Sequence, residues 1–205
     1  MSRNVWVLAF ICLMLAVPAL AGGIEVTPTL GYRWGGEFGD LTLDGKAAEL
    51  SLDDSEAYGL IFTFPVTSRV DFEFRWSRQS TDLEVFPAHL VAPDETTADS
   101  FLGGIVVFFP VESKTIRPFM NVELGATQFD VGNGFSGDAA FAFAVGGGSK
   151  FYFGDHFGLR VQASYLNGTI PGDQTIFCSA EHCYESISRN TTAQIELTTG
   201  FVFRF

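Results

Sequence analysis

The chain has 205 residues, a formal net charge of −12, and only 18% charged residues. Phenylalanine and glycine occur 22 times each, a composition too apolar and aromatic for a disordered chain. The length suits one domain with a sizeable core, and the acidic balance argues against a nucleic-acid partner, because phosphate binding needs clustered lysine and arginine.

The first residues have the features of a secretory signal peptide. Arg3 supplies a positive charge, residues 5–17 form an apolar run, and Ala19-Leu20-Ala21 matches an A-x-A cleavage site. We therefore expect residues 1–21 to be removed after Ala21, leaving one domain over 22–205. No later run is long and apolar enough for a transmembrane helix, so any membrane crossing depends on strands.

The rest of the chain alternates apolar residues with polar or small ones at a period of two, which predicts β-strands with two different faces. Segments of about ten residues match the length of a tilted transmembrane strand. Eight of them follow in chain order: 24–34, 58–64, 70–77, 99–109, 118–127, 139–153, 157–165 and 194–205.

Two of these segments have irregular patterns. Pro28 lacks a backbone N–H, so we expect a bulge or weakened pairing in the first strand. The segment 99–109 is apolar on both faces, and its register is ambiguous. We favour the register that places these side chains outward: Phe101, Ile105, Val107 and Phe109.

The connections between the strands alternate in length. Long connections are expected at about 35–55, 80–98, 130–138 and 167–190, and short turns at 65–68, 110–116 and 154–156. Within the first long connection, Asp44-Gly45 indicates a two-residue hairpin turn and hence strands that continue beyond the barrel. An even strand number with short turns at one end and long loops at the other is typical of a transmembrane barrel.

Three observations indicate that the apolar face points outward. The opposite face is rich in glycine and alanine, as a crowded lumen requires, and aromatic residues gather at the strand ends. That face also carries charges of both signs, which can pair in a narrow interior. They are Glu25, Arg33, Asp71, Glu73, Arg75, Glu123, Lys150, Arg160, Glu196 and Arg204. We predict a lumen charge network of Asp71, Glu73, Arg75, Arg160, Glu196 and Arg204.

Closure of the barrel requires the first and last strands to pair. Unpaired strand edges in hydrocarbon cost several kcal/mol per group. We therefore expect the start of the mature chain and Phe205 to lie together at the short-turn end. The sequence predicts an all-β fold, an eight-stranded antiparallel up-and-down transmembrane β-barrel.

Cys178 and Cys183 are the two cysteines that remain after the signal peptide, and they lie close together in a polar stretch. In an exported protein, a short-loop disulfide is the favoured interpretation. A metal site that uses both cysteines with His182 is the alternative, although the sequence shows no fourth ligand.

An acidic run in the first long connection also has two interpretations. These carboxylates could bind Ca²⁺ or Mg²⁺ between lipopolysaccharide phosphates. A solvated loop is the favoured interpretation, and we predict no metal site. The run comprises Asp40, Asp44, Glu49, Asp53, Asp54 and Glu56.

Three stretches resemble one known group of proteins: residues 25–36 (EVTPTLGYRWGG), 146–150 (GGGSK) and 200–205 (GFVFRF). Together with the signal peptide, they resemble the small eight-stranded outer-membrane barrels of Gram-negative bacteria, the OmpA-like/OmpW-like superfamily. The resemblance implies the cell outer membrane as the location, with outer-membrane lipids and lipopolysaccharide as surroundings.

The resemblance also implies a role for the C-terminal aromatic residues. Phe201, Phe203 and Phe205 look like the signal read by the outer-membrane insertion machinery, which the chain would reach with periplasmic chaperones. We expect a monomer.

An eight-stranded barrel has an interior that side chains can fill. We therefore expect a structural or loop-mediated binding role at the cell surface. A narrow channel for small or hydrophobic solutes is the alternative function.

A barrel enzyme that modifies lipid A or phospholipid would need a histidine beside a serine nucleophile. His89 and His182 lie in expected loops and His156 in a turn, so we predict no catalytic residues and no cofactor.

Overall fold

The computed structural model describes most of the chain after the predicted signal peptide. The described residues are 23–43, 46–81, 83–86, 96–113, 115–131, 136–170, 175–178, 183–186 and 190–205. Residues 1–21, the predicted signal peptide, lie outside them. None of the described residues forms a helix long and apolar enough to cross a membrane.

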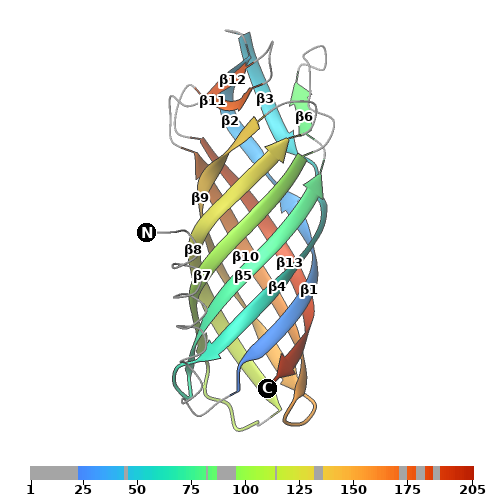
Figure 1. Ribbon diagram of the computed structural model, residues 1–205, viewed down its shortest axis with the longest axis vertical. Helices are drawn as coiled ribbons and strands as arrows, with labels where there is room; N and C mark the ends of the chain where they lie inside the picture. Colours follow the sequence, from blue (N-terminus) through green and yellow to red (C-terminus); the bar gives the residue numbers. More distant parts are fainter. Residues whose placement is uncertain are drawn as a thin grey trace, which may run out of the picture.

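Eight long strands close a tilted antiparallel barrel (Figure 1). Consecutive strands pair around the wall, and the last pairs with the first from Trp34↔Ile195 to Glu25↔Arg204. The predicted up-and-down barrel is confirmed. Its strands are β1 (Glu25–Gly35), β4 (Ser55–Pro65), β5 (Val70–Thr81), β7 (Thr96–Phe108), β8 (Ile116–Val131), β9 (Ser136–Tyr152), β10 (Phe157–Ile170) and β13 (Asn190–Arg204).

Five further strands extend the sheet beyond the barrel at the loop end, at the top of Figure 1. They continue from β9 in the order β11, β12, β2, β3 and β6. We call these five strands the surface sheet. Their bounds are β2 (Glu37–Leu43), β3 (Lys46–Leu52), β6 (Leu83–Phe86), β11 (Thr175–Cys178) and β12 (Cys183–Ser186).

The hairpin predicted from Asp44-Gly45 is present, because Leu43 pairs with Lys46 across a two-residue connection. Asp44 and Gly45 themselves lie outside the described residues. The pairing of β12 with β2 and of β3 with β6 was not predicted. Segments that the sequence assigned to three separate long loops therefore join one sheet.

Several barrel strands are longer than predicted, so parts of the expected loops are strand. β8 and β9 leave only residues 132–135 between them, whereas the sequence suggested a loop over 130–138. β10 and β13 likewise extend into the expected loop 167–190. The reason is chemical: residues such as Thr169 and Thr191 pair across these extensions but lack the apolar alternation that marks a strand in sequence.

The predicted faces are confirmed. Outward residues such as Leu30 and Phe201 are 68% and 66% exposed, whereas the lumen charges Glu73 and Lys150 are fully buried. In β7, the favoured register also holds: Leu102, Val106 and Phe108 are buried. The side chains predicted to point outward there are exposed, namely Phe101, Ile105, Val107 and Phe109.

Pro28 weakens the pairing of β1 without forming a bulge. The β1–β13 partners pass from Val26↔Phe203 to Thr29↔Gly200 in one register, with Thr27 and Pro28 left unpaired on that side. On the other side, Pro28 keeps its place opposite Leu60. The missing N–H therefore interrupts one ladder and leaves the other intact.

The two ends of the described chain meet at the short-turn end, as predicted. The backbone N–H of Phe205 donates to the carbonyl oxygen of Ile24 at 3.0 Å. Figure 1 shows the C-terminus at the end opposite the surface sheet.

Gly104 marks a point where two strands approach too closely for a side chain. A Cβ there would lie 2.0 Å from the Val122 carbonyl oxygen, while Gly103, which points outward, has its nearest atom at 3.6 Å. Gly104 also lies between Glu73 and Glu123 in register. The glycine therefore allows β7 and β8 to approach closely beside the lumen carboxylates of Glu73 and Glu123.

We predict that Gly104→Ala lowers the free energy of unfolding by about 1–3 kcal/mol, because the added methyl must displace backbone. Gly103→Ala is the matched control and should stay close to wild type. Urea unfolding of the refolded protein in lipid vesicles measures both. Equal stability of the two variants would contradict the close approach.

Candidate functional site

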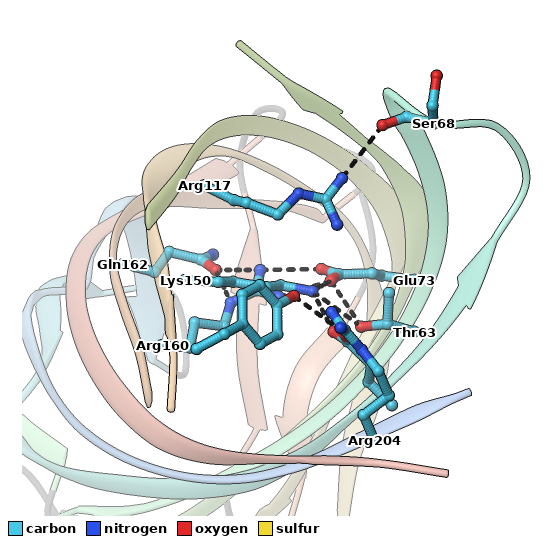
Figure 2. A network of polar contacts seen from close by, with 10 residues as sticks. Thr63, Ser68, Glu73, Arg117, Lys150, Arg160, Gln162 and Arg204 are labelled. Atoms are coloured by element: carbon cyan, nitrogen blue, oxygen red, sulfur yellow. Dashed lines mark hydrogen bonds and ion pairs between the residues drawn. The ribbon is translucent and has the colours of Figure 1, made fainter. Parts of the chain in front are cut away.

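The lumen holds two clusters of buried charges, and the first lies toward the short-turn end (Figure 2). We call it the lower cluster; its members are Glu25, Glu73, Lys150, Arg160 and Arg204. Lys150 Nζ lies 2.8 Å from Glu25 Oε2 and 3.1 Å from Glu73 Oε1. One ammonium on β9 therefore joins carboxylates from β1 and β5 across the lumen.

Glu73 accepts a two-pronged contact from Arg160. Arg160 Nη1 lies 2.5 Å from Glu73 Oε1, and Nη2 donates to Oε2 at 2.8 Å. Thr63 Oγ1 also donates to Glu73 at 2.7 Å, while Arg160 Nε donates to Gln162 at 2.8 Å. Paired planar groups of this kind form the strongest ionic hydrogen bonds.

Glu25 closes the lower cluster against the chain end. It accepts from Arg204 Nη2 at 2.7 Å and from the Tyr152 hydroxyl at 2.9 Å. The Arg204 guanidinium also stacks over the Tyr152 ring at 4.1 Å. Each carboxylate in the lower cluster is therefore shared by at least two cations.

The second group, the upper cluster, comprises Arg33, Arg75, Glu123 and Glu196. Arg33 Nε lies 2.5 Å from Glu196 Oε2, and Arg75 Nη1 lies 3.2 Å from Glu196 Oε1. Arg75 Nη2 reaches Glu123 Oε2 at 2.8 Å. The cluster is electrically neutral, spans β1, β5, β8 and β13, and is almost fully buried.

The structure divides the six residues of the predicted charge network. Glu73, Arg160 and Arg204 lie in the lower cluster, and Arg75 and Glu196 lie in the upper one. Asp71 is buried but, among the residues that the structure describes, has no side-chain hydrogen bond or ion pair.

Four residues of the clusters were not included in the predicted network: Glu25, Arg33, Glu123 and Lys150. Strand alternation had placed all four on the lumen face, and the structure confirms that they are buried there. The sequence held no signal for which of these charges would pair.

The other site predictions fall mainly at the loop end. The backbone places Cys178 opposite Cys183 in the β11–β12 pairing, and the disulfide stays a prediction because their side chains lie outside the described residues. His89 and His182 also lie outside them, while His156 is exposed in a turn.

The acidic run is only partly described. Asp54 Oδ1 accepts from the Gly35 N–H at 2.8 Å, so one of these carboxylates has a structural role at the end of β1. In the part of the chain that the structure describes, no group of three or more histidine, cysteine or carboxylate side chains could hold a metal ion. The C-terminal aromatic residues Phe201, Phe203 and Phe205 all face outward.

Comparison with known proteins identifies the fold. The sequence matches no family model and no curated protein. The structure is similar to the outer membrane protein OprG from Pseudomonas aeruginosa, with a TM-score of 0.65 and 14% identity over 90% of this chain and 96% of that one.

Two further solved structures are similar. Neisserial surface protein A has a TM-score of 0.59 and 11% identity over 89% of this chain and 97% of that one. The outer membrane protein AlkL, solved in lipid bilayers, has a TM-score of 0.58 and 15% identity over 90% of this chain and 91% of that one. The chain therefore has the fold of the small eight-stranded outer-membrane barrels.

We predict that Glu73→Gln lowers the free energy of unfolding by about 3–5 kcal/mol, because it leaves Arg160 and Lys150 without their shared carboxylate. Urea unfolding in lipid vesicles measures the loss.

Asp99→Asn is the matched control, since Asp99 pairs with the partly exposed Arg78 at 2.6 Å. Exposed pairs contribute only about 0–1 kcal/mol. Equal losses in Glu73→Gln and Asp99→Asn would contradict a central role for the lower cluster.

Proposed function

We propose that this protein is an integral outer-membrane barrel that does not conduct solutes and that acts through its surface sheet. The observation that carries the proposal is the pairing across the lumen. Lys150 connects β9 to β1 and β5, and Arg75 connects β5 to β8 and β13. These buried ion pairs cross the lumen at two levels.

The exterior of the barrel supports a membrane location. Large apolar side chains that would be costly to expose to water cover the outward face of every barrel strand. Aromatic residues such as Trp34 and Tyr165 lie toward the loop end, and Phe153 and Phe157 toward the short-turn end. This two-girdle pattern is typical of barrels in lipid.

The remaining assignments follow from this placement and from the resemblance of the sequence. The short-turn end would face the periplasm, and the surface sheet would stand among the lipopolysaccharide head groups. Export would use the signal peptide removed after Ala21, and insertion would use the C-terminal aromatic residues with the assembly machinery and chaperones. We infer a monomer without enzymatic activity.

The surface sheet suits a binding role because it is built from segments of three different loops held by backbone pairing. A surface that is already ordered loses less conformational entropy on binding than three independent loops. A protein or glycan partner at the cell surface fits this placement.

A narrow channel is the second candidate function. Asn121 is buried in the lumen, and both polar atoms of its amide lack a hydrogen-bond partner in the described structure. Buried polar groups of this kind commonly hold ordered water. A water path past Asn121 would favour conduction of very small solutes.

Conductance in a planar bilayer distinguishes the two functions. The refolded wild-type barrel should give a silent bilayer, because the two ionic clusters block the lumen. Lys150→Ala combined with Glu73→Ala removes the central part of the lower cluster and should also be silent, because the upper cluster still crosses the lumen. Reproducible discrete current steps from the wild type would overturn the blocked lumen and support the channel.

We also predict that Phe72→Arg or Phe201→Arg weakens folding in lipid, by about 2–4 kcal/mol for a side chain at the bilayer midplane and less toward an interface, because each places a charge on the lipid-facing side of the barrel. Val66→Arg is the control, since Val66 is exposed in the turn after β4. Unfolding in lipid vesicles measures all three. Wild-type stability of both phenylalanine variants would refute the lipid-facing assignment.

A further inference from the structure

A cavity of about 520 Å³ opens at the short-turn end of the barrel. It lies beside the β4–β5 turn and the segment that follows β7, and its volume is in the range of small-molecule sites. The ionisable residues that line it are Glu25, Arg69, Asp71, Arg117 and Arg204. Ligand binding here would be separate from any role of the surface sheet.

Asp71 is a buried carboxylate of this cavity that forms no hydrogen bond or ion pair with the described residues. Asp71 is only 3% exposed, and it lines the cavity. Nearby Glu25 and Glu73 are each held by two cations, whereas Asp71 has no side-chain hydrogen bond or ion pair within the described chain. The Asp71 carboxylate therefore takes its hydrogen bonds from whatever fills the cavity, either water or a ligand that carries a donor.

Two arginines of the cavity have donors to spare. Arg117 is fixed by stacking over the Phe108 ring at 3.8 Å and by donating Nη2 to the Ser68 carbonyl oxygen at 3.2 Å. Figure 2 shows Arg117 reaching toward Ser68, apart from the lower cluster. Arg69 is exposed in the turn, and its side chain makes no hydrogen bond or ion pair with the described residues.

The charges of the lining complement an anion. Arg204 is committed to Glu25 at 2.7 Å as part of the lower cluster. The remaining lining charges are Arg69 and Arg117 against Asp71. Their balance is one positive charge, and both arginines can attract the carboxylate of a ligand. Guanidinium groups suit a carboxylate in particular, because they can bind both of its oxygens.

We propose that this cavity binds a small organic carboxylate that carries a hydrogen-bond donor on the neighbouring carbon. The carboxylate lies between Arg69 and Arg117 at the mouth. The donor, a hydroxyl or an ammonium group, points inward and is accepted by Asp71. The ligand thus supplies the partner that Asp71 lacks within the barrel.

Three isosteric probes test this assignment in the full-length mature protein refolded in detergent micelles. L-lactate, L-alanine and propionate share one carbon skeleton and differ in a hydroxyl, an ammonium or a hydrogen next to the carboxylate. NMR titration that follows the backbone amides of Thr67, Ser68 and Arg69 measures each dissociation constant. Lactate, alanine or both should bind about tenfold more tightly than propionate, because each adds a hydrogen bond to a charged group.

Variants then assign the two halves of the ligand. Asp71→Asn should abolish the roughly tenfold preference for the donor-bearing probe over propionate, since only the donor meets Asp71. The loss of the negative charge acts on the carboxylate of all three probes and does not restore the preference. Arg117→Gln should weaken all three probes, because all carry the carboxylate. Asp155→Asn is the matched control: Asp155 is exposed in another turn at the same end and does not line the cavity.

Several results would overturn the proposal. Equal affinity of the three probes for the wild type would remove the role of Asp71, and so would an unchanged preference in Asp71→Asn. The absence of shifts in the 67–69 turn would remove the site. Heat-modifiability on a gel checks that each variant forms a closed barrel. If Asp71→Asn does not fold, the probe comparison on the wild type and Arg117→Gln still decides the outcome.

Discussion

The structure depends on the pairing of buried charges inside a narrow barrel. A charge removed from water is tolerated only when an opposite charge and further hydrogen bonds replace its hydration. Here, Glu73 is met by Arg160, Lys150 and Thr63, and Glu196 by Arg33 and Arg75. Because these partners come from different strands, the pairing also holds the register of the wall. A shift of one residue in any of these strands would turn its charge out toward lipid.

Much of the fold could be predicted from the sequence because both faces of the barrel carry a clear physical signal. Lipid demands large apolar side chains and the lumen demands small or charged ones, so a period of two is visible along each strand. The same rule places Arg33 and Lys150 inside as reliably as Glu73. In β7, which is apolar on both faces, the alternation left the register ambiguous, and only the structure shows why Phe101 points outward: its neighbour Leu102 packs with Ala142 and Leu166 inside.

The rest could not be predicted, for two different reasons. Alternation assigns a residue to a face of the strand but gives neither its position along the barrel axis nor its partner. It could therefore not show that Glu73 pairs with two cations while Asp71 forms no ion pair with the described residues. In the surface sheet, no contrast between an apolar exterior and a charged lumen imposes an alternation on the strands. The strand pairing there joins segments far apart in the chain, such as Tyr184 with Leu43, and strands of four to seven residues carry little local signal of such partners.

The surface sheet restricts how the sequence at the loop end of this protein can vary. Because β3 pairs with both β2 and β6, and β2 pairs with β12, an insertion in any one of these segments disturbs the backbone pairing of the others. An antibody raised against this end would recognise a discontinuous epitope that depends on conformation. Among related sequences, this end would therefore tolerate changes of outward side chains more readily than changes of loop length.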